Sequence, residues 1–578
     1  MNILSAKQSY RQKQNIVLEK NYRVSKNFFR SDKILSNFLT ENISPDGFAQ
    51  MHPKLIELGG EAAGKMNDLS LAADKKGPEL IKRNFLGETM NEISFHPAYW
   101  ELMDIAVKSD MFRVKWEPGN KKKFKMELHR LGFSAGYLFA LSECGQFCPL
   151  CMTDGVARLI DIFCTEEDKN RLLPHIYTEK VSEFFTGAMY LTEKTGGSDV
   201  GANITLADPT SEKNIYTLTG EKWFCSNANA DLIFALARTD ENCKGTKGLS
   251  IFLVEKFLPD GKKNPIDIIR LKEKLGVRSM ASAECMLEET TGKLVGNEFE
   301  GFKVMVEMIN LSRLYNSVGA LSSSRRALIE AYQFITHRQT FGKYAIEHAL
   351  IRTKLLELGS LNVANFYLTW RAIKSLDLAD NGDEKESQLF RIINPMTKKW
   401  SAETGVYITR ECMELMGGIG YIEDGVMPKL MRDVMVLPIW EGSGNIIILD
   451  MLRAMFKSNG FEILCEEIFK SGSTSKKIQW GDFNFSDWLK KELTVLISFS
   501  EKLKKFNRDE MEASSKMFFE KLTTLFQISI LIENFNEESK NWILPSVKFL
   551  KSKYSPEEIQ ELIPPSVEEV KGLIGWDF

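Results

Sequence analysis

The spacing of apolar residues separates an N-terminal stretch from the rest of the chain. Between residues 30 and 185, apolar side chains recur every three to four positions, as in residues 95–107 and 131–141. This period predicts amphipathic helices. Pro174 falls in a later segment, where we expect a helix to break. We therefore expect an N-terminal helical domain over residues 1–185.

The pattern changes near residue 186, where short segments rich in aromatic and branched residues begin. They are separated by turn residues such as Gly220, which lies between residues 214–219 and 222–226. Short strands at regular spacing are typical of an all-β unit rather than of βαβ alternation. We expect a β-domain over residues 186–300.

Helical periodicity returns after residue 301 in long stretches, and a polar break at residues 379–387 separates two helices. We assign residues 301–456 to a helical bundle domain and residues 457–578 to an additional helical block. The pattern predicts that this block is entered through residues 471–477 and closed by Pro564 and Pro565. The predicted fold class is α+β and mainly α.

Composition excludes several classes of protein. Of 578 residues, 43% are apolar and 26% charged, unlike a disordered chain. The formal charge of −3 gives no general attraction to nucleic acid or anionic lipid. We expect no membrane span, because no apolar stretch reaches the ~18 residues that a span requires. Nine cysteines, an odd number in a large chain, favour a reducing compartment over a disulfide framework.

The first thirty residues hold seven basic residues and one acid, Glu19. Such a segment is typical either of an organelle transit peptide or of a solvated, frayed end. We adopt the second interpretation and expect a cytoplasmic protein, or one of the mitochondrial matrix if the source is eukaryotic. The basic residues are Lys7, Arg11, Lys13, Lys20, Arg23, Lys26 and Arg30.

A metal site has little support in the sequence. None of the six histidines stands at a zinc-ligand spacing. Cys144, Cys148 and Cys151 form a C-x3-C-x2-C pattern, which is compatible with a metal or redox site, but no fourth ligand is near. We interpret these thiols as small buried apolar side chains and expect no metal.

One glycine-containing loop deserves a chemical interpretation. The string LTEKTGGSDVG at residues 191–201 offers a hydroxyl at Thr192 and two glycines that let a ligand approach the backbone. Alone it is compatible with an ordinary loop. It is not the G-x-G-x-x-G fingerprint of a nicotinamide site, which the chain lacks.

Four further strings follow in a fixed order: GEKWFCSN at 220–227, HRQTFGK at 337–343, LMGGIGY at 415–421 and IWEGSGNI at 439–446. The ordered set resembles the acyl-CoA dehydrogenase superfamily of flavoenzymes over roughly residues 90–455. RLKEKLG at 270–276 and the extra C-terminal block resemble its AidB branch. The resemblance implies a helical domain, a β-domain and a four-helix domain around FAD, in a homotetramer.

The resemblance also implies roles for individual residues. Leu191 and Thr192 would bind the flavin ring, while Phe224 and Ser226 would lie at its face. A second group of residues would bind the FAD of a neighbouring subunit. The guanidinium of Arg338 suits the phosphates of FAD. The second group consists of Arg338, Phe341, Glu414, Gly417 and Gly418. Ser443 and Asn445 would contact FAD as well, and Ser198, Arg313 and Gly442 would contact the substrate.

Glu441 is the candidate catalytic base. The reaction of the superfamily removes the α-proton of an acyl thioester while hydride leaves the β-carbon for FAD. This requires a carboxylate whose pKa is raised by burial. Glu441 lies between Trp440 and Gly442, which suits a desolvated carboxylate, although it could also cap a helix starting near Ser443. Some members place the base just before the arginine that matches Arg313, where this chain has Ser312.

Lys194 is the main departure from the superfamily, whose ordinary members have proline there. The lysine lies in the loop expected near flavin and thioester, and it could contact CoA or remain solvated.

An AidB-type C-terminal block also raises the question of whether the protein binds DNA. Residues 456–578 hold 17 Lys and Arg against 20 Asp and Glu, so we expect the block to pack on the protein and not to bind DNA tightly.

Three functions remain open from the sequence. The leading one is an FAD-dependent acyl-CoA dehydrogenase that forms a trans-2-enoyl-CoA and passes electrons to electron-transfer flavoprotein or a similar acceptor. The second is an AidB-like flavin-containing protein that binds acyl-CoA or serves a stress response with weak turnover. The third is an oxidase that uses oxygen directly.

Overall fold

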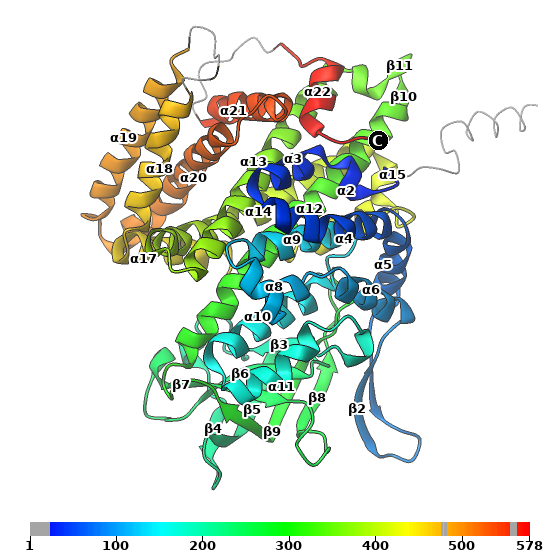
Figure 1. Ribbon diagram of the computed structural model, residues 1–578, viewed down its shortest axis with the longest axis vertical. Coiled ribbons are helices and arrows are strands. Elements are labelled where there is room, and N and C mark those ends of the chain that lie inside the picture. The colour runs from blue at the N-terminus through cyan, green and yellow to red at the C-terminus, as the bar shows by residue number, and fades with distance from the viewer. Residues whose placement is uncertain (1–23, 476–477, 479–482, 555–562) are drawn as a thin grey trace, which may run out of the picture.

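The computed structural model describes residues 24–475, 478, 483–554 and 563–578. Most strands gather at one end of the molecule, and helices form most of the remainder (Figure 1). The fold is therefore α+β and mainly helical, as predicted. Of the basic N-terminal residues, Lys26 and Arg30 are described, and the other five lie outside these ranges.

Helices form most of the N-terminal region. They are α2 (Phe28–Ser31), α3 (Lys33–Asn42), α4 (Pro45–Ala63), α5 (Lys65–Lys75), α6 (Pro97–Lys108), α7 (Arg113–Trp116), α8 (Pro118–Lys123), α9 (Leu128–Ala140), α10 (Phe147–Phe163) and α11 (Glu166–Ile176).

Two details of this region differ from the prediction. Strands β1 (Glu79–Arg83) and β2 (Thr89–Ser94) form an antiparallel hairpin within the stretch expected to be helical. Both strands alternate between exposed and partly buried residues, which is the period of a strand and not of a helix. Pro174 lies inside α11, which continues two residues beyond it.

The β-domain is built from β3 (Gly187–Tyr190), β4 (Leu206–Pro209), β5 (Ile215–Ser226), β6 (Leu232–Arg238), β7 (Leu249–Glu255), β8 (Ile266–Leu271) and β9 (Ser282–Leu294). Three 3-10 turns accompany it: η1 (Val181–Glu183), η2 (Val200–Ala202) and η3 (Gly245–Gly248). Strands β3-β6-β4-β5-β9-β7 follow one another in the sheet, β8 pairs with β9, and β6 also pairs with β7. Every residue of β6 is buried, so this strand is the centre of the domain.

From the sequence we expected Gly220 to separate two strands, and this prediction is wrong. Gly220 lies inside β5, where φ is +151° and the pairing with β9 shifts register between Leu218 and Gly220. A Cβ at this position would lie 2.7 Å from the hydroxyl of Thr205. Glycine therefore lets one long strand bend past its neighbour.

Long helices resume at residue 301. They include α12 (Gly301–His337), α13 (Ala349–Asp380), α14 (Glu384–Met416), α15 (Gly418–Tyr421), α16 (Met427–Val434) and α17 (Gly444–Lys457), with η4 (Ala345–Glu347) and the short strands β10 (Gln339–Thr340) and β11 (Lys343–Tyr344) before α13. Helix α12 starts directly on the sheet, because a Cβ at Gly301 would lie 2.3 Å from the carbonyl carbon of Ser250. Residues 311–332 of α12 are buried among helices, so α12 connects the β-domain to the bundle.

The last block contains α18 (Gly460–Thr474), α19 (Phe485–Leu503), α20 (Arg508–Glu533), α21 (Lys540–Tyr554) and α22 (Val567–Ile574). Two of its predicted limits are wrong: residues 471–474 belong to α18, and α22 follows Pro564 and Pro565. The block lies along α13 and α14 (Figure 1). The indole of Trp542 donates to the hydroxyl of Tyr367 over 3.1 Å, and Arg371 pairs with Glu467 at 2.5 Å. The prediction that this block packs on the protein is confirmed.

Candidate active site

Glu441 lies in a strained turn just before α17. Its φ is +58° and that of Gly442 is +107°. A left-handed conformation costs a residue with a side chain about 1–3 kcal/mol, so the surroundings must hold it. Arg313 Nε donates to the carbonyl of Glu441 over 3.3 Å, and Lys398 Nζ donates to the carbonyl of Gly442 over 2.6 Å. Cationic side chains from α12 and α14 thus fix the turn.

The carboxylate of Glu441 points back toward α12. The hydroxyl of Ser312 donates to its Oε2 over 2.5 Å. Burial raises the pKa of the Glu441 carboxyl group, while the Ser312 hydrogen bond and the charges of Lys398 and Arg313 oppose the rise. Burial also lowers the pKa of Lys398 to about 7. The net shift in the pKa of Glu441 is upward, which is the direction that a general base acting near neutral pH requires.

A small, mostly apolar pocket adjoins this carboxylate. It is formed by the first turns of α10, the middle of α12 and the turn before α17. Its lining residues are Cys144, Phe147, Cys148, Cys151, Met152, Ser312, Tyr315, Asn316, Gly319, Leu437, Trp440 and Glu441. Such a lining suits a hydrocarbon chain beside a single catalytic acid.

The three clustered cysteines line this pocket. Burial raises the pKa of each thiol above its usual range, so all three stay protonated and behave as apolar groups. All nine cysteines of the chain are unpaired. Within the described residues, no three His, Cys, Asp or Glu side chains are arranged to hold a metal ion.

The flavin-binding residues expected in the β-domain lie together. The backbone N–H of Trp223, on β5, donates to the carbonyl of Thr192 over 2.9 Å. Asn203 fixes the carbonyl of Leu191 over 2.7 Å. Phe224 leaves 56% of its surface exposed, which is unusual for an aromatic residue within a strand. Leu191, Thr192 and Phe224 therefore frame one open surface beside β5.

The ammonium group of a lysine, Lys272, lies over the aromatic rings of this surface. Lys272 Nζ lies 3.7 Å from the ring centre of Trp223 and 4.6 Å from that of Phe224, and it pairs with Glu284 at 2.7 Å. Lys194, the departure from the superfamily pattern, pairs with Glu221 at 2.7 Å. Lys194 thus has a protein partner, like most exposed lysines.

Ser226, the last residue of β5, approaches Ser282 and Lys274. Its hydroxyl lies 3.5 Å from that of Ser282, which accepts from Lys274 Nζ over 3.3 Å. Glu441 and Lys274 both act electrostatically on the thiol of Cys148. Both charged groups thus influence the Cys148 thiol of the pocket, while no described hydrogen bond or ion pair joins Ser226 to Glu441.

The remaining predicted residues form a separate group. A Cβ at Gly417 would lie 3.4 Å from Arg338 Nη1, and the N–H of Gly417 donates to the carbonyl of Glu414 over 2.9 Å. Phe341 is 98% exposed, and nothing lies within 4 Å of a Cβ placed at Gly418. Among the described residues, no hydrogen bond or ion pair joins this group to the Glu441 turn.

Three predicted residues are exposed at the rim of these surfaces. Ser198 lies in the loop after β3, Ser443 is the N-cap of α17, and Asn445 is in its first turn. Arg313, in contrast, is buried and pairs with Asp450 at 2.7 Å. Its guanidinium therefore positions the Glu441 turn from within the protein.

Comparison with known proteins decides the family. The family model "Acyl-CoA dehydrogenase, middle domain" matches residues 188–290, and "Acyl-CoA dehydrogenase, C-terminal domain" matches residues 300–456. The "Adaptive response protein AidB N-terminal domain" matches residues 20–180. AidB of Escherichia coli strain K12 is 33% identical over 421 residues, which cover 71% of this chain and 75% of AidB. The chain belongs to the acyl-CoA dehydrogenase family.

Solved structures agree on the fold of this acyl-CoA dehydrogenase. Caenorhabditis elegans ACDH-11, solved in complex with C11-CoA, has a TM-score of 0.86 at 23% identity, covering 94% of this chain and 93% of that one. An acyl-CoA dehydrogenase from Bacillus anthracis, solved with FAD, has a TM-score of 0.68 at 17% identity, covering 95% and 98%.

As a member of this family the protein is an FAD-dependent oxidoreductase, and its residues fit that cofactor. The half-exposed Phe224 offers an apolar face, and the hydroxyls of Thr192 and Ser226 suit the polar edge of a ring. Arg338 beside the open Gly417–Gly418 backbone suits phosphate groups. No helix within the described residues is long and apolar enough to cross a membrane.

Sequence reasoning missed two residues of this acyl-CoA dehydrogenase site. From the sequence, Ser312 is only a position that cannot supply a base, whereas in the structure its hydroxyl donates to Glu441. Lys398 was not considered, because a lysine within a long helix has no local signal. The C-x3-C-x2-C pattern is the sequence sign of the pocket wall. Three thiols clustered near the start of α10 could have suggested that this segment lines a pocket.

Proposed function

We propose that this acyl-CoA dehydrogenase converts an acyl-CoA thioester into a trans-2-enoyl-CoA with Glu441 as the base. The Glu441 carboxylate takes the proton from the α-carbon, and the hydrogen on the β-carbon leaves as hydride. FAD, when bound, accepts that hydride. The observation that carries the proposal is the carboxylate of Glu441, which is partly buried beside an apolar pocket and held by Ser312.

Proton removal requires that the negative charge developing on the thioester oxygen be stabilised. Within the described residues, the backbone N–H of Glu441 has no hydrogen-bond acceptor, unlike the carbonyl oxygens of Glu441 and Gly442, which are bound. This N–H supports the proposal as a donor for the thioester oxygen. The left-handed turn leaves it free while Arg313 and Lys398 restrain the neighbouring carbonyls.

The pocket favours a hydrocarbon acyl group over a polar one. Its thiols, Met152 and the rings of Phe147 and Trp440 exclude water from the α- and β-carbons, which strengthens the electrostatic action of Glu441. The C. elegans protein in complex with C11-CoA supports an acyl-CoA ligand for this fold.

We extend the proposal to the cofactor contacts and partners. Leu191, Thr192, Phe224 and Ser226 would hold the ring of FAD, and Ser198 would contact the substrate. Arg338, Phe341, Glu414, Gly417 and Gly418 would hold the FAD of a neighbouring subunit in a homotetramer, with Ser443 and Asn445 contributing. Electrons would pass to electron-transfer flavoprotein or a similar acceptor.

The test is an anaerobic titration of the FAD-loaded protein with saturated acyl-CoAs of increasing chain length, observing the flavin absorption band. Bleaching with one length class, lost in Glu441→Gln while FAD is retained, is the expected result. Glu143→Gln is a matched control, because Glu143 is a buried carboxylate that binds Ser70, Ser279 and Lys429 and does not itself line the pocket.

Two outcomes would contradict the proposal. Tight acyl-CoA binding without bleaching would identify a binding protein of the AidB type with weak turnover. Full bleaching by Glu441→Gln would assign proton removal to another group.

A further inference from the structure

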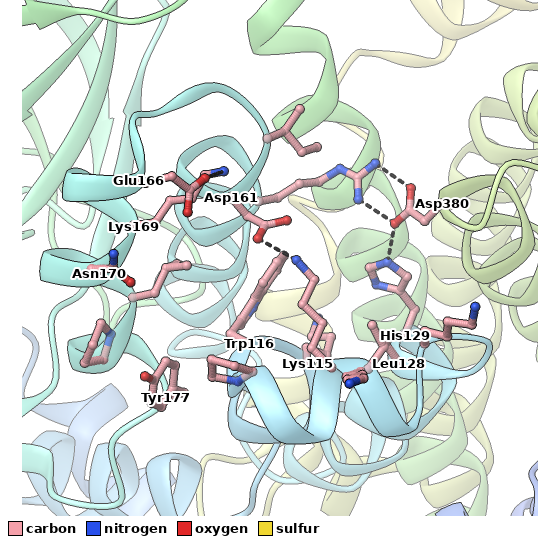
Figure 2. Close-up of a pocket in the computed structure, with 18 of the residues that line it drawn as sticks. Lys115, Trp116, Leu128, His129, Asp161, Glu166, Lys169, Asn170, Tyr177 and Asp380 are labelled. Atoms are coloured by element: carbon pink, nitrogen blue, oxygen red, sulfur yellow. Dashed lines mark hydrogen bonds and ion pairs between the residues drawn. The ribbon is translucent and has the colours of Figure 1, made fainter.

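A second cleft lies on the N-terminal helices, away from Glu441. It has a volume of about 760 Å³ and is bounded by α8, the start of α9, the end of α10, α11 and the end of α13 (Figure 2). It shares no lining residue with the Glu441 pocket. The pocket uses the first turns of α10, whereas the cleft uses residues 158–162 at the other end of that helix.

The lining of the cleft is cationic. Six lysines and arginines face it against three aspartates and glutamates. Lys121 pairs with Asp161 at 2.5 Å, and Lys169 pairs with Glu166 at 2.6 Å. Arg158 and Lys115 are likewise paired, with Asp380 and Asp154.

Two lysines of the lining remain without such a partner. Lys122 and Lys125 are exposed, and neither makes an ion pair with any residue that the structure describes. An anion in the cleft would therefore meet two ammonium groups whose charge the protein itself does not neutralise.

A buried polar atom in the same wall also lacks a partner. His129 is only 4% exposed, and its Nε2 lies 2.9 Å from Asp380. Its Nδ1 is buried and has no hydrogen-bond partner. Such atoms are rare in folded proteins and call for a physical explanation. A bound polar ligand would supply the missing partner.

The rest of the lining is apolar or amide-bearing. Ile162, Pro174 and Tyr177 offer aliphatic or aromatic surface, Trp116 is largely buried, and the side-chain amide of Asn170 offers hydrogen bonds. Trp116, Tyr177 and Asn170 are labelled in Figure 2. A ring that carries hydrogen-bonding groups fits this mixture better than an alkyl chain.

We propose that this cleft is a second ligand site, separate from the acyl-CoA and FAD sites, for a phosphate-bearing nucleotide. The phosphate lies at Lys122 and Lys125, and the base and sugar lie against the side of the cleft that carries Tyr177. His129 and Asn170 hydrogen-bond the polar edges of the ligand. The site belongs to the N-terminal region and takes no part in the chemistry at Glu441.

The test uses the full-length protein loaded with FAD, so that the ADP part of the FAD site is occupied. ADP, adenosine and decanoate are titrated separately by isothermal calorimetry. We expect one ADP per chain and weaker binding of adenosine. The charge reversal Lys122→Glu with Lys125→Glu is expected to weaken ADP at least about tenfold, since it replaces charge-assisted contacts with repulsion.

Two further variants locate the ligand. Ile162→Trp fills the cleft from a residue that is 45% exposed, and it is expected to weaken ADP similarly without changing the charge. Lys505→Glu with Lys516→Glu makes the same charge change on the C-terminal block and is expected to leave ADP binding unaltered. Absence of saturable ADP binding, equal binding by all variants, or binding of decanoate without ADP would overturn the proposal.

Discussion

The Ser312 hydroxyl donates a hydrogen bond of 2.5 Å to the carboxylate of Glu441. The two residues come from different elements, α12 and the turn before α17. In relatives that place the base at the position of Ser312, the acid would approach the substrate from α12. Here Ser312 on α12 instead supplies a hydrogen-bond donor, which lowers the pKa of Glu441 on the neighbouring turn.

We expect Ser312→Ala to change the pH dependence of flavin reduction. The hydrogen bond stabilises the ionised carboxylate, so its removal raises the pKa of Glu441 further. The reduction rate increases as Glu441 loses its proton, and this rise should therefore move to higher pH. Anaerobic stopped-flow measurements between pH 5.5 and 9, in buffers of constant ionic strength, check this shift.

Ser317→Ala is the matched control for that experiment. Ser317 lies on the same helix, and its hydroxyl donates to the carbonyl of Arg313 over 2.8 Å. Its removal is expected to leave the pH profile in place. An unshifted profile in Ser312→Ala would mean that the rise reports a group other than Glu441.

The buried pair of Asp32 and Arg325 is expected to stabilise the fold. Arg325 Nη2 lies 2.9 Å from Asp32, and Arg325 Nη1 donates to the carbonyl of Ile574 over 2.7 Å. Removal of one buried partner leaves an uncompensated charge, so Asp32→Ala should reduce the free energy of unfolding by about 3–5 kcal/mol. Urea denaturation measures the change.

Lys33→Ala provides the contrast from the adjacent position. Lys33 pairs with Asp577 at 2.7 Å, but both side chains are more than half exposed. The expected change in the free energy of unfolding is below about 1 kcal/mol. Equal effects of the two variants would show that burial does not determine the strength of these pairs.

Phe341 is expected to connect oligomerisation with FAD retention. It is 98% exposed and has a φ of +51°, next to Arg338 and the Gly417 turn. If a neighbouring subunit covers it, Phe341→Ser should lower both the oligomer size, measured by light scattering, and the flavin content. Phe85→Ser, at a 95% exposed phenylalanine of the β1–β2 hairpin, should change neither. Loss of flavin from an intact oligomer would separate the two properties.

The C-terminal block is expected to bind duplex DNA only weakly. Its most basic run is flanked by acids: Lys504 pairs with Glu501 at 2.7 Å, and Arg508 with Glu512 at 2.8 Å. These pairs neutralise the charges that phosphates would need. Fluorescence anisotropy with a plain duplex at about 150 mM salt should give no sub-micromolar binding. Tight binding that weakens steeply with added salt would contradict this expectation.

Much of the fold could be predicted because its elements have strong local signals. The polar break at residues 379–387 lies where α13 ends at Asp380 and α14 begins at Glu384. The β1–β2 hairpin could not be predicted in the same way. Its side chains are mostly exposed, so its alternating pattern contains too few apolar residues to stand out from the helices around it.

The sequence by itself determined the kinds of elements, the family and the residue types that carry the chemistry, since periodicity and ordered motifs are local properties of the chain. Only the tertiary structure decided which groups meet. Ser312 and Glu441 are 129 positions apart, and Lys398 reaches the carbonyl of Gly442 from another helix. Contacts of this kind depend on how long helices pack side by side, which determines both the burial of a carboxylate and the donors that face it.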